Sequence, residues 1–413
     1  MQKILIVISL LMAGISIGNI PEFMERRNLG EVENNSIDEA SGLAASKINP
    51  GILWTHNDSG DENRIFAVAL NGGNVGVFYI DGAENRDWED MEIGSGPVEG
   101  KEYIYIADIG DNEAKYEEKY IYRIEEPKIP ENHSGIIDTL INVSKITFTY
   151  PDGNRDSETL LFDPLTKDIF LLSKRDSDIR LYSLRYPQSI SEVITAELVD
   201  VLNFPDDPEI NKPYNYITSG DISNDGSEII IKTYSNIYYW LRDPEESVTA
   251  TLSSKQPAYL PFARSVDETQ GEAVCWNSSE NKGYFTLAEE KIFVNNTEFN
   301  FPAQLYYYER IQPNDLEIDE IIRDFKLNQN FPNPFNPETI IEYDLPYARF
   351  VELTVYDKTG EKIADLVEQY QNAGHYKVKF DASSLDVKLS SGIYFYRINF
   401  GGEIETKSMV FIK

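Results

Sequence analysis

The heptapeptide Phe331-Pro332-Asn333-Pro334-Phe335-Asn336-Pro337 divides the chain into two parts that differ in organisation. Proline fixes φ and has no backbone N–H, so three prolines in seven residues exclude a helix or a central strand here. The segment predicts a rigid, extended lead-in to a separate domain. We place that domain at residues 325–413, which leaves 19–324 as the front domain.

Beyond the heptapeptide, apolar and polar residues alternate in short runs, and Gly or Pro follows each run. The runs lie at residues 340–345, 351–356, 376–380 and 393–398. Alternation interrupted by a turn about every ten residues is typical of a small β-sandwich. We therefore expect an all-β domain at the C-terminal end.

Five motifs in this domain stand in the order of a known family. They are residues 327–337, Val355-Tyr356-Asp357 with Gly360, Gly374-His375-Tyr376, residues 391–397, and Lys407-Ser408-Met409. With these motifs the domain resembles the type A sorting domain of the bacterial type IX secretion system. The resemblance implies that the partner is that secretion machinery, that the chain is exported across the outer membrane, and that the domain is then removed. An accessory β-sandwich without a sorting role is the alternative.

The N-terminal segment predicts export as well. Lys3 precedes an apolar run at residues 4–17, and Ser16-Ile17-Gly18 supplies small residues for cleavage, so residues 1–18 read as a signal peptide. No later segment reaches the roughly 20 apolar residues of a membrane-spanning helix. We expect a mature protein without a transmembrane segment, either secreted or held at the outer cell surface.

Charge and cysteine content exclude several classes of protein. The net charge is −33. Residues 325–413 contribute only −2, from 10 Lys and Arg against 12 Asp and Glu. A front domain with this much negative charge repels the phosphate groups of nucleic acids and attracts cations. Nucleic acid is therefore not expected as a partner. Cys275 is the single cysteine, so no internal disulfide stabilises the fold.

A unit of roughly 50 to 70 residues recurs in the front domain, a period typical of propellers. Each unit opens with a short run in which polar or acidic residues precede an apolar strand. The openings lie at residues 39–44, 87–91, 156–161, 219–223 and 270–274. They predict a β-propeller of five four-stranded blades, with six possible and a pair of β-sandwiches as the competing fold. The fifth unit lacks a fourth strand, which residues 27–32 could supply to close the ring.

The front domain also resembles a group of secreted bacterial β-propeller proteins of unassigned function. The residues that carry this resemblance are Ser41-Gly42-Leu43-Ala44, residues 53–60, Asp87-Trp88-Glu89-Asp90, Ile109-Gly110-Asp111-Asn112 and Gly271-Glu272-Ala273. It covers residues 37 to 312 and implies a fold and a set of functional positions, but no reaction.

In a propeller, the start of each innermost strand and the end of each second strand lie on one face. This geometry predicts an acidic, funnel-shaped ligand site on that face. Its candidate ligand-binding residues are Glu39, His56, Asn57, Asp58, Glu89, Asp90, Asp111, Asn112, Glu158, Lys174, Arg175, Asp221 and Glu272. Lys232 is expected among them.

Carboxylates gathered in one place raise one another's pKa unless a cation compensates. Oxygen ligands of this kind suit Ca²⁺, which takes six to eight of them. The candidate metal ligands are Asp58, Asp61, Glu89, Asp90, Asp108 and Asp111. The alternative is that Asp, Asn, Gly and Ser simply form tight turns here.

Catalytic patterns are sparse. The chain has three histidines and neither a G-x-S-x-G nor an H-E-x-x-H motif. His56, oriented by Asp58, is the candidate general base. We expect a propeller that binds an unknown extracellular ligand and Ca²⁺. The alternatives are a calcium-dependent phosphate-ester hydrolase of the phytase type, in which Lys174, Arg175 and Lys232 would clamp phosphate, and a structural or adhesive surface protein.

Overall fold

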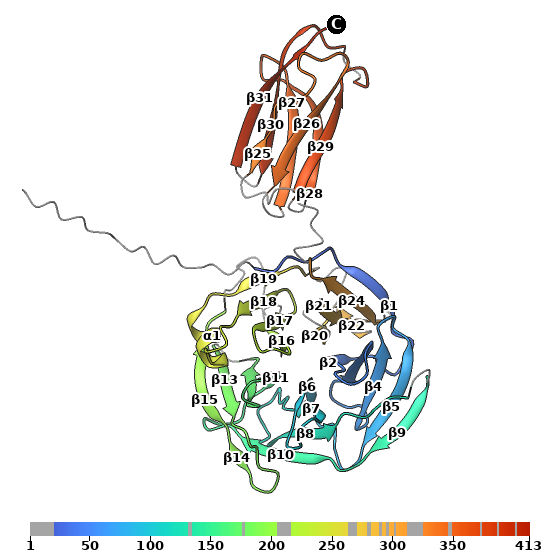
Figure 1. The fold of residues 1–413 in the computed structure, drawn as a ribbon, viewed down its shortest axis with the longest axis vertical. Coiled ribbons are helices and arrows are strands. Elements are labelled where there is room, and N and C mark those ends of the chain that lie inside the picture. Colours follow the sequence, from blue (N-terminus) through green and yellow to red (C-terminus); the bar gives the residue numbers. More distant parts are fainter. Residues whose placement is uncertain are drawn as a thin grey trace, which may run out of the picture. The chain divides into compact units, whose positions relative to one another are not determined.

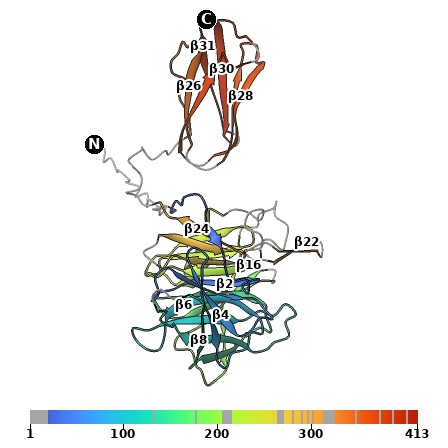
Figure 2. The same ribbon diagram turned by 90° about the vertical axis from the view of Figure 1, so that its right-hand side faces the viewer.

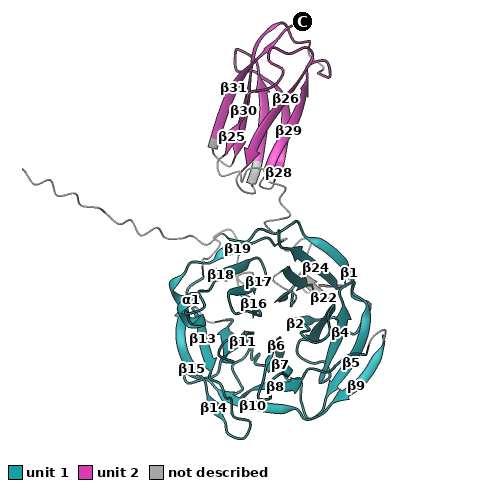
Figure 3. Ribbon diagram, in the orientation of Figure 1, with its two compact units in different colours: residues 1–312 teal, residues 313–413 magenta. Residues whose placement is uncertain are grey.

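The chain separates into two compact units, residues 1–312 and residues 313–413 (Figure 3). The computed structural model describes residues 20–413 except 131–133, 176–177, 205–215, 263–270, 279–281, 289–290, 295–296, 301–302, 312–324, 346–348, 372–373, 386–387 and 401–402. The predicted signal peptide at residues 1–18 therefore lies outside the described residues.

The first unit is a β-propeller, in which sheets are arranged around a central axis (Figure 1). Five strands lie innermost and neighbour one another in turn around that axis, and the last lies beside the first. They are β2 (Ala40–Ala45), β6 (Trp88–Ser95), β11 (Ser157–Phe162), β16 (Ile217–Ile222) and β20 (Ala273–Trp276). These are the segments that the sequence repeat placed innermost. The number of blades in the whole chain stays a prediction.

Each sheet continues outward by antiparallel pairing. The second strands are β3 (Ile52–Asn57), β7 (Glu102–Asp108), β12 (Ile169–Ser173), β17 (Glu228–Thr233) and β21 (Gly283–Leu287). The third strands are β4 (Arg64–Ala69), β8 (Lys119–Glu125), β13 (Ile179–Leu184), β18 (Ile237–Leu241) and β24 (Gln304–Glu309). The fourth strands are β5 (Asn74–Ile80), β10 (Ser144–Thr149), β15 (Glu197–Leu202), β19 (Ala258–Leu260) and β1 (Arg27–Glu31).

The N-terminal strand β1 pairs antiparallel with β24, as expected from the missing strand in the last unit. It joins the first described strand of the chain to the sheet of the last repeat. Closure of this kind removes the exposed edges at which other chains could pair.

Some elements of the first unit were not predicted. β9 (Ile136–Leu140) pairs parallel with β5, and β14 (Ile194–Thr195) pairs parallel with β10, so two sheets carry a fifth strand. The helix α1 (Val248–Ser254) precedes β19. The hairpin of β22 (Lys291–Val294) and β23 (Thr297–Asn300) lies at the margin of the unit in the side view (Figure 2).

Hydrophobic cores lie between neighbouring sheets. Between the second and third sheets, for example, Tyr105 and Phe148 pack with Leu160 and Leu171. Another cluster joins the first sheet to the last, where Leu43 and Phe66 pack with Cys275 and Leu305. Because both faces of a sheet are covered, the inner strands are buried along their length, and small residues are needed near the axis. A Cβ atom at Gly42 would lie 2.5 Å from Nε2 of His56.

The second unit is a β-sandwich, as predicted. One sheet holds β25 (Lys326–Leu327), β26 (Glu338–Leu345) and β29 (Gly374–Asp381). The other holds β28 (Lys362–Gln371), β27 (Arg349–Tyr356), β30 (Gly392–Phe400) and β31 (Glu403–Phe411). Their inward residues share one core, to which the heptapeptide contributes Phe335. The backbone of Phe335 is held at the end of β31: its N–H donates to the carbonyl of Val410, and its carbonyl accepts from the N–H of Ile412, just after the strand.

Candidate functional site

Five carboxylates from four sheets meet on the face where the inner strands begin and the second strands end. Oxygens of Asp58, Asp87 and Glu89 lie within 4.8 Å of one another, and so do oxygens of Glu89, Glu158 and Glu272. Glu89 belongs to both groups. We call these five residues the acid cluster. Glu89, Glu158 and Glu272 are 3%, 2% and 5% exposed, so the cluster is largely removed from water.

Local irregularities of the inner strands aim two of these side chains. Trp88 pairs with Asp108 and Asp90 with Ala107, so Glu89 is an extra residue in β6. Glu158 is the extra residue in β11 in the same way, between Ser157 and Thr159. An extra residue bulges out of the ladder and redirects its side chain. The bulges therefore point both glutamates toward the same place.

Gly110 provides the space that the cluster occupies. A Cβ atom there would lie 2.0 Å from Oε1 of Glu89 and 2.6 Å from Oδ2 of Asp87. Any other residue would push into these carboxylates. Gly110 is part of the Ile109-Gly110-Asp111-Asn112 motif singled out from the sequence. Its lack of a side chain lets the carboxylates of Glu89 and Asp87 lie close to the backbone.

One lysine reaches into the cluster. Nζ of Lys174 lies 2.6 Å from Oε1 of Glu158 and 4.0 Å from Oε1 of Glu272. The Tyr234 hydroxyl donates a hydrogen bond to Glu272 and also lies 3.4 Å from Lys174 Nζ. Burial lowers the pKa of Lys174, but its attraction to Glu158 and Glu272 outweighs that effect, so the pKa is raised well above its usual value. Lys174 is therefore a permanent cation here.

Arg175 is the next cation along the chain. Its Nη1 lies 2.5 Å from Asp156 and 3.7 Å from Glu158. With Asp156 included, six carboxylates face two cationic side chains, which would leave a net charge of −4 if every acid were ionised. Lys174 and Arg175 alone cannot neutralise these acids. Lys119 and Arg86 also attract Asp87, but each has a partner of its own in Asp111 and Asp108.

The pKa values follow from this excess of acid. Burial, reinforced by repulsion from Glu272 and Glu158, raises the pKa of Asp58 to about 8. Burial raises the pKa of Glu158 to about 7, although Lys174 acts against it. The pKa of Glu89 is raised well above its usual value by burial and by the charges of Glu158 and Asp58. Without a further cation, the cluster holds protons at neutral pH.

One buried oxygen of the cluster finds no donor among the residues that the structure describes. It is Oε2 of Glu158, whose residue is 2% exposed. A buried carboxylate oxygen normally accepts at least one hydrogen bond. Either a proton on a neighbouring carboxyl group or a metal ion would satisfy it. The donor set consists of oxygens alone, which suits a hard cation such as Ca²⁺ better than Zn²⁺.

Asp90 does not join the cluster, although we predicted it as a metal ligand. Its carboxylate accepts hydrogen bonds from the backbone N–H groups of Met91, Leu160 and Gly220 and from the Ser219 hydroxyl. These donors come from three inner strands. Asp90 therefore ties the strands together, and its oxygens are already occupied.

Asp221 also lies elsewhere. It accepts a hydrogen bond of 2.7 Å from the Trp276 backbone and interacts with Glu92. Burial raises the pKa of Asp221 to about 6. These two acids form a separate pair beside Cys275, whose pKa is raised by burial and by both carboxylates.

The remaining predicted metal ligands have protein partners. Asp61 pairs with Arg64 at 2.6 Å, Asp108 lies 3.5 Å from Arg86, and Asp111 lies 3.0 Å from Lys119. Asp111 additionally accepts the backbone N–H groups of Lys115 and Tyr116, as in a tight turn. For Asp111 the turn chemistry that we kept as the alternative describes the geometry. Of the six predicted metal ligands, the structure brings Asp58 and Glu89 together.

The other predicted ligand-binding residues lie around this site. Asn57 donates its side-chain amide to Asp61 and to the Ser36 carbonyl, Glu39 is partly buried beside Asn57, and Asn112 is exposed. Lys232 is fully buried, and its ammonium group donates to the backbone carbonyls of Thr233 and Gly271.

His56 is enclosed in the core. It is 0% exposed, its Nδ1 lies 2.9 Å from the Asn57 carbonyl oxygen, and its ring packs edge-on against Trp88. Burial lowers its pKa to about 4, so the ring is neutral at physiological pH. The ring contacts the loop backbone, and no oxygen of Asp58 orients it in the described geometry.

Three residues of the site were outside the predicted set, namely Asp87, Asp156 and Tyr234. Asp87 and Asp156 each stand just before an inner strand, so the rule that selected Glu39 could have selected them too. Tyr234 follows the second strand β17 and reaches the site by its hydroxyl group. Its place directly after a second strand, in Lys232-Thr233-Tyr234, is the signal that puts it on the same face as the other candidates.

Residues 329–413 match the family described as the secretion system C-terminal sorting domain. Among solved structures, the chain is similar to a luciferin-regenerating enzyme, with 9% identity, a TM-score of 0.38, and coverage of 67% of this chain and 94% of that one. It is also similar to the Dos1 propeller, with 12% identity, a TM-score of 0.29, and coverage of 66% and 78%. A third is a putative glucose dehydrogenase of Thermus thermophilus, with 8% identity, a TM-score of 0.34, and coverage of 69% and 99%. A comparison with curated proteins gives no match.

The chain is thus a β-propeller followed by a sorting domain that directs secretion or export to the cell surface. The sorting domain implies the type IX secretion machinery as a partner. In the described part of the chain, no helix has the length and apolar character to cross a bilayer.

Proposed function

We propose that the propeller holds a divalent cation, Ca²⁺ best of all, in the acid cluster and binds an extracellular ligand at that site. The observation that carries the proposal is the group of five converging carboxylates, one of which has a buried oxygen with no donor in the described part of the chain. Glu89 would bridge the two halves of the site because it belongs to both groups. Of the metal ligands predicted from the sequence, the proposed site keeps Asp58 and Glu89, and it adds Asp87, Glu158 and Glu272.

Calcium matches the chemistry of these residues. It accepts six to eight oxygens at about 2.3–2.6 Å and tolerates irregular geometry, whereas Mg²⁺ demands a tight octahedron and gives up water reluctantly. Five carboxylates from four separate segments supply many oxygens without a regular polyhedron. A buried site also favours the ion that dehydrates more readily.

The geometry supports binding more directly than hydrolysis. A phosphate-ester hydrolase would need cationic side chains free to hold the phosphate. Lys174 and Arg175 are engaged by Glu158 and Asp156, and Lys232 is engaged by backbone carbonyls. The hydrolase stays the second candidate, because a metal ion that took over Glu158 would release Lys174 toward a bound anion. An adhesive role for the outer rim is the third.

Calorimetry with a matched pair of variants tests the cation proposal. We expect Ca²⁺ to bind the full chain and to raise its melting temperature relative to chelator, since a hundredfold excess over Kd stabilises by about 2.7 kcal/mol. Glu89→Gln should abolish both effects. Glu245→Gln, which changes an exposed acid outside the cluster, should retain them. Equal Ca²⁺ responses in the two variants would reject the acid cluster as the site.

We also propose that the signal peptide and the sorting domain are removed during export, leaving the propeller released or anchored at the outer surface. Deleting residues 325–413 should then trap a folded propeller inside the cell. Normal surface delivery of the shortened chain would contradict this.

A further inference from the structure

The heptapeptide at residues 331–337 has two phenylalanines with opposite environments. Phe335 is buried in the sandwich core with 2% exposure, whereas Phe331 is 79% exposed. Phe335 is needed in the motif because its side chain forms part of the sandwich core. An aromatic side chain held in water gains nothing from folding, so Phe331 calls for another explanation.

The backbone holds Phe331 in position. Its N–H donates to the carbonyl of Ile340 at 2.9 Å, and the N–H of Ile340 donates back at 2.9 Å. Residues paired in this way lie directly opposite each other, with their side chains on the same face. Ile340 is 43% exposed. The two side chains therefore form a fixed apolar pair on the surface.

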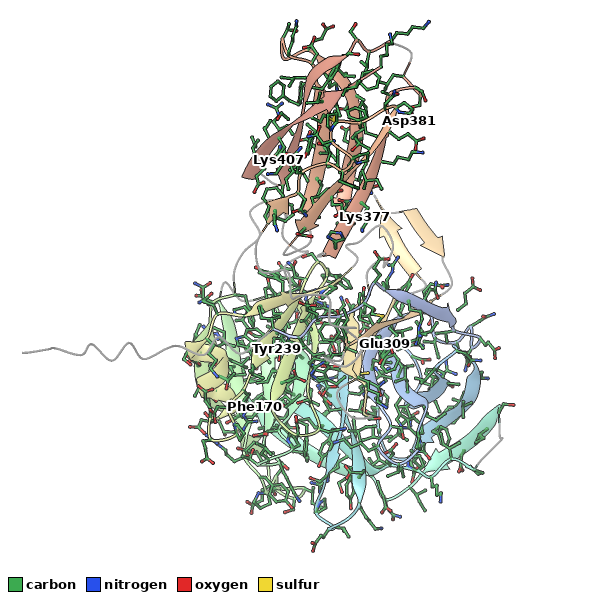
Figure 4. All side chains as sticks on the ribbon, turned by 45° about the horizontal axis from the view of Figure 1, so that its top comes forward. Phe170, Tyr239, Glu309, Lys377, Asp381 and Lys407 are labelled. Atoms are coloured by element: carbon green, nitrogen blue, oxygen red, sulfur yellow. The ribbon has the colours of Figure 1, made fainter. Side chains whose placement is uncertain are left out.

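Charged residues surround this pair. Outward positions of β26 are Glu338, Ile340, Glu342 and Asp344, so Ile340 interrupts a row of acids. On the neighbouring strand β29, Lys379 pairs with Glu338 at 2.7 Å, and Lys377 pairs with Glu342 at 2.9 Å. Lys377 and Asp381 are labelled on this unit in Figure 4. We call Phe331 and Ile340 with their charged rim the Phe331 patch.

We propose that the Phe331 patch is the surface by which the protein component of the secretion machinery that reads this domain binds it. A rigid apolar centre inside a polar rim is the arrangement of a binding hot spot, in which one or two buried anchors supply most of the affinity. The partner would offer an apolar pocket that accepts an aromatic ring. This occupant follows from the sorting family matched at residues 329–413. The inference is independent of the cation site.

Export assays of the full chain in a bacterium with this secretion system test the proposal. We expect Phe331→Ser with Ile340→Ser to lower the secreted fraction at least tenfold, while the purified variant melts as the native chain does. The single variant Phe331→Tyr keeps an aromatic ring at this position and should be exported like the native chain. Ile404→Ser alters a side chain that is 59% exposed on the other sheet, and should be exported normally. Phe335→Ala should lose export together with the fold.

Three results would overturn the proposal. One is normal export of the double variant, and another is an equal loss in Ile404→Ser. The third is a purified native chain that sediments as a dimer and becomes a monomer in the double variant, which would assign the patch to self-association.

Discussion

Replacing Lys174 by Met probes whether the acid cluster controls the stability of the propeller. Nζ of Lys174 lies 2.6 Å from Glu158 and 4.0 Å from Glu272. At an effective dielectric constant of 20, these distances correspond to attractions of about 6 and about 4 kcal/mol, which the desolvation of the buried ammonium group partly offsets. Removing one partner of a buried pair typically costs about 3–5 kcal/mol. We expect a loss of this size at pH 8 in chelator.

The loss should depend on pH and on Ca²⁺. At pH 5, Glu158 and Glu272 can take up protons when Lys174 is absent, so the loss of stability should be smaller than at pH 8. If Ca²⁺ and Lys174 compensate the same carboxylates, saturating Ca²⁺ should stabilise Lys174→Met more than the native chain.

Urea unfolding followed by tryptophan fluorescence measures these differences, and the four tryptophans all lie in the first unit. Lys101→Met is the control, because Lys101 forms an exposed pair with Glu125 and its replacement should leave the stability almost unchanged. An equal loss for Lys174→Met at both pH values, unaltered by Ca²⁺, would refute the reasoning.

Three further predictions follow from the described contacts. Because the folded-state pKa values of Glu158 and Asp58 are raised to about 7 and about 8, the folded state binds more protons than the unfolded state above about pH 4.5. The metal-free chain should therefore lose stability as pH rises to 8, by an amount on the order of 3 kcal/mol from Glu158 alone, and Ca²⁺ should reverse the loss in urea titrations. Asp90→Asn should destabilise by about 2–3 kcal/mol in the same assay, since its amide group would face backbone donors, yet calorimetry should find Ca²⁺ binding retained. Cys275, which is 1% exposed and whose pKa is raised by burial, should react with a thiol reagent only when the propeller unfolds.

The sequence predicted the inner strands because their pattern is local. An acidic or polar residue followed by small and apolar residues occurs at each opening, and short strands separated by turns follow. The added strands β9 and β14 were not predictable in this way, because each pairs with a strand from an earlier part of the chain. Long-range pairing leaves no periodic signal in the segment itself.

The candidate site was predicted in part. Glu89, Glu158, Glu272 and Asp58 meet, as expected for strand starts and ends on one face. The roles of Glu89 and Asp90 could not be separated from the sequence, because a bulge at Glu89 breaks the alternation of side chains in β6. His56 was misleading for a similar reason, since only the packing of Trp88 and Gly42 around its ring reveals that it is enclosed.

Anomalous diffraction from crystals of the full chain grown with Ca²⁺ would test the central claim most directly. We expect a peak about 2.3–2.6 Å from carboxylate oxygens of Glu89, Glu158 and Glu272, with Asp58 and Asp87 completing the site. A cluster without a peak, in which Lys174 remains on Glu158 and carboxyl protons fill the gaps, would contradict it.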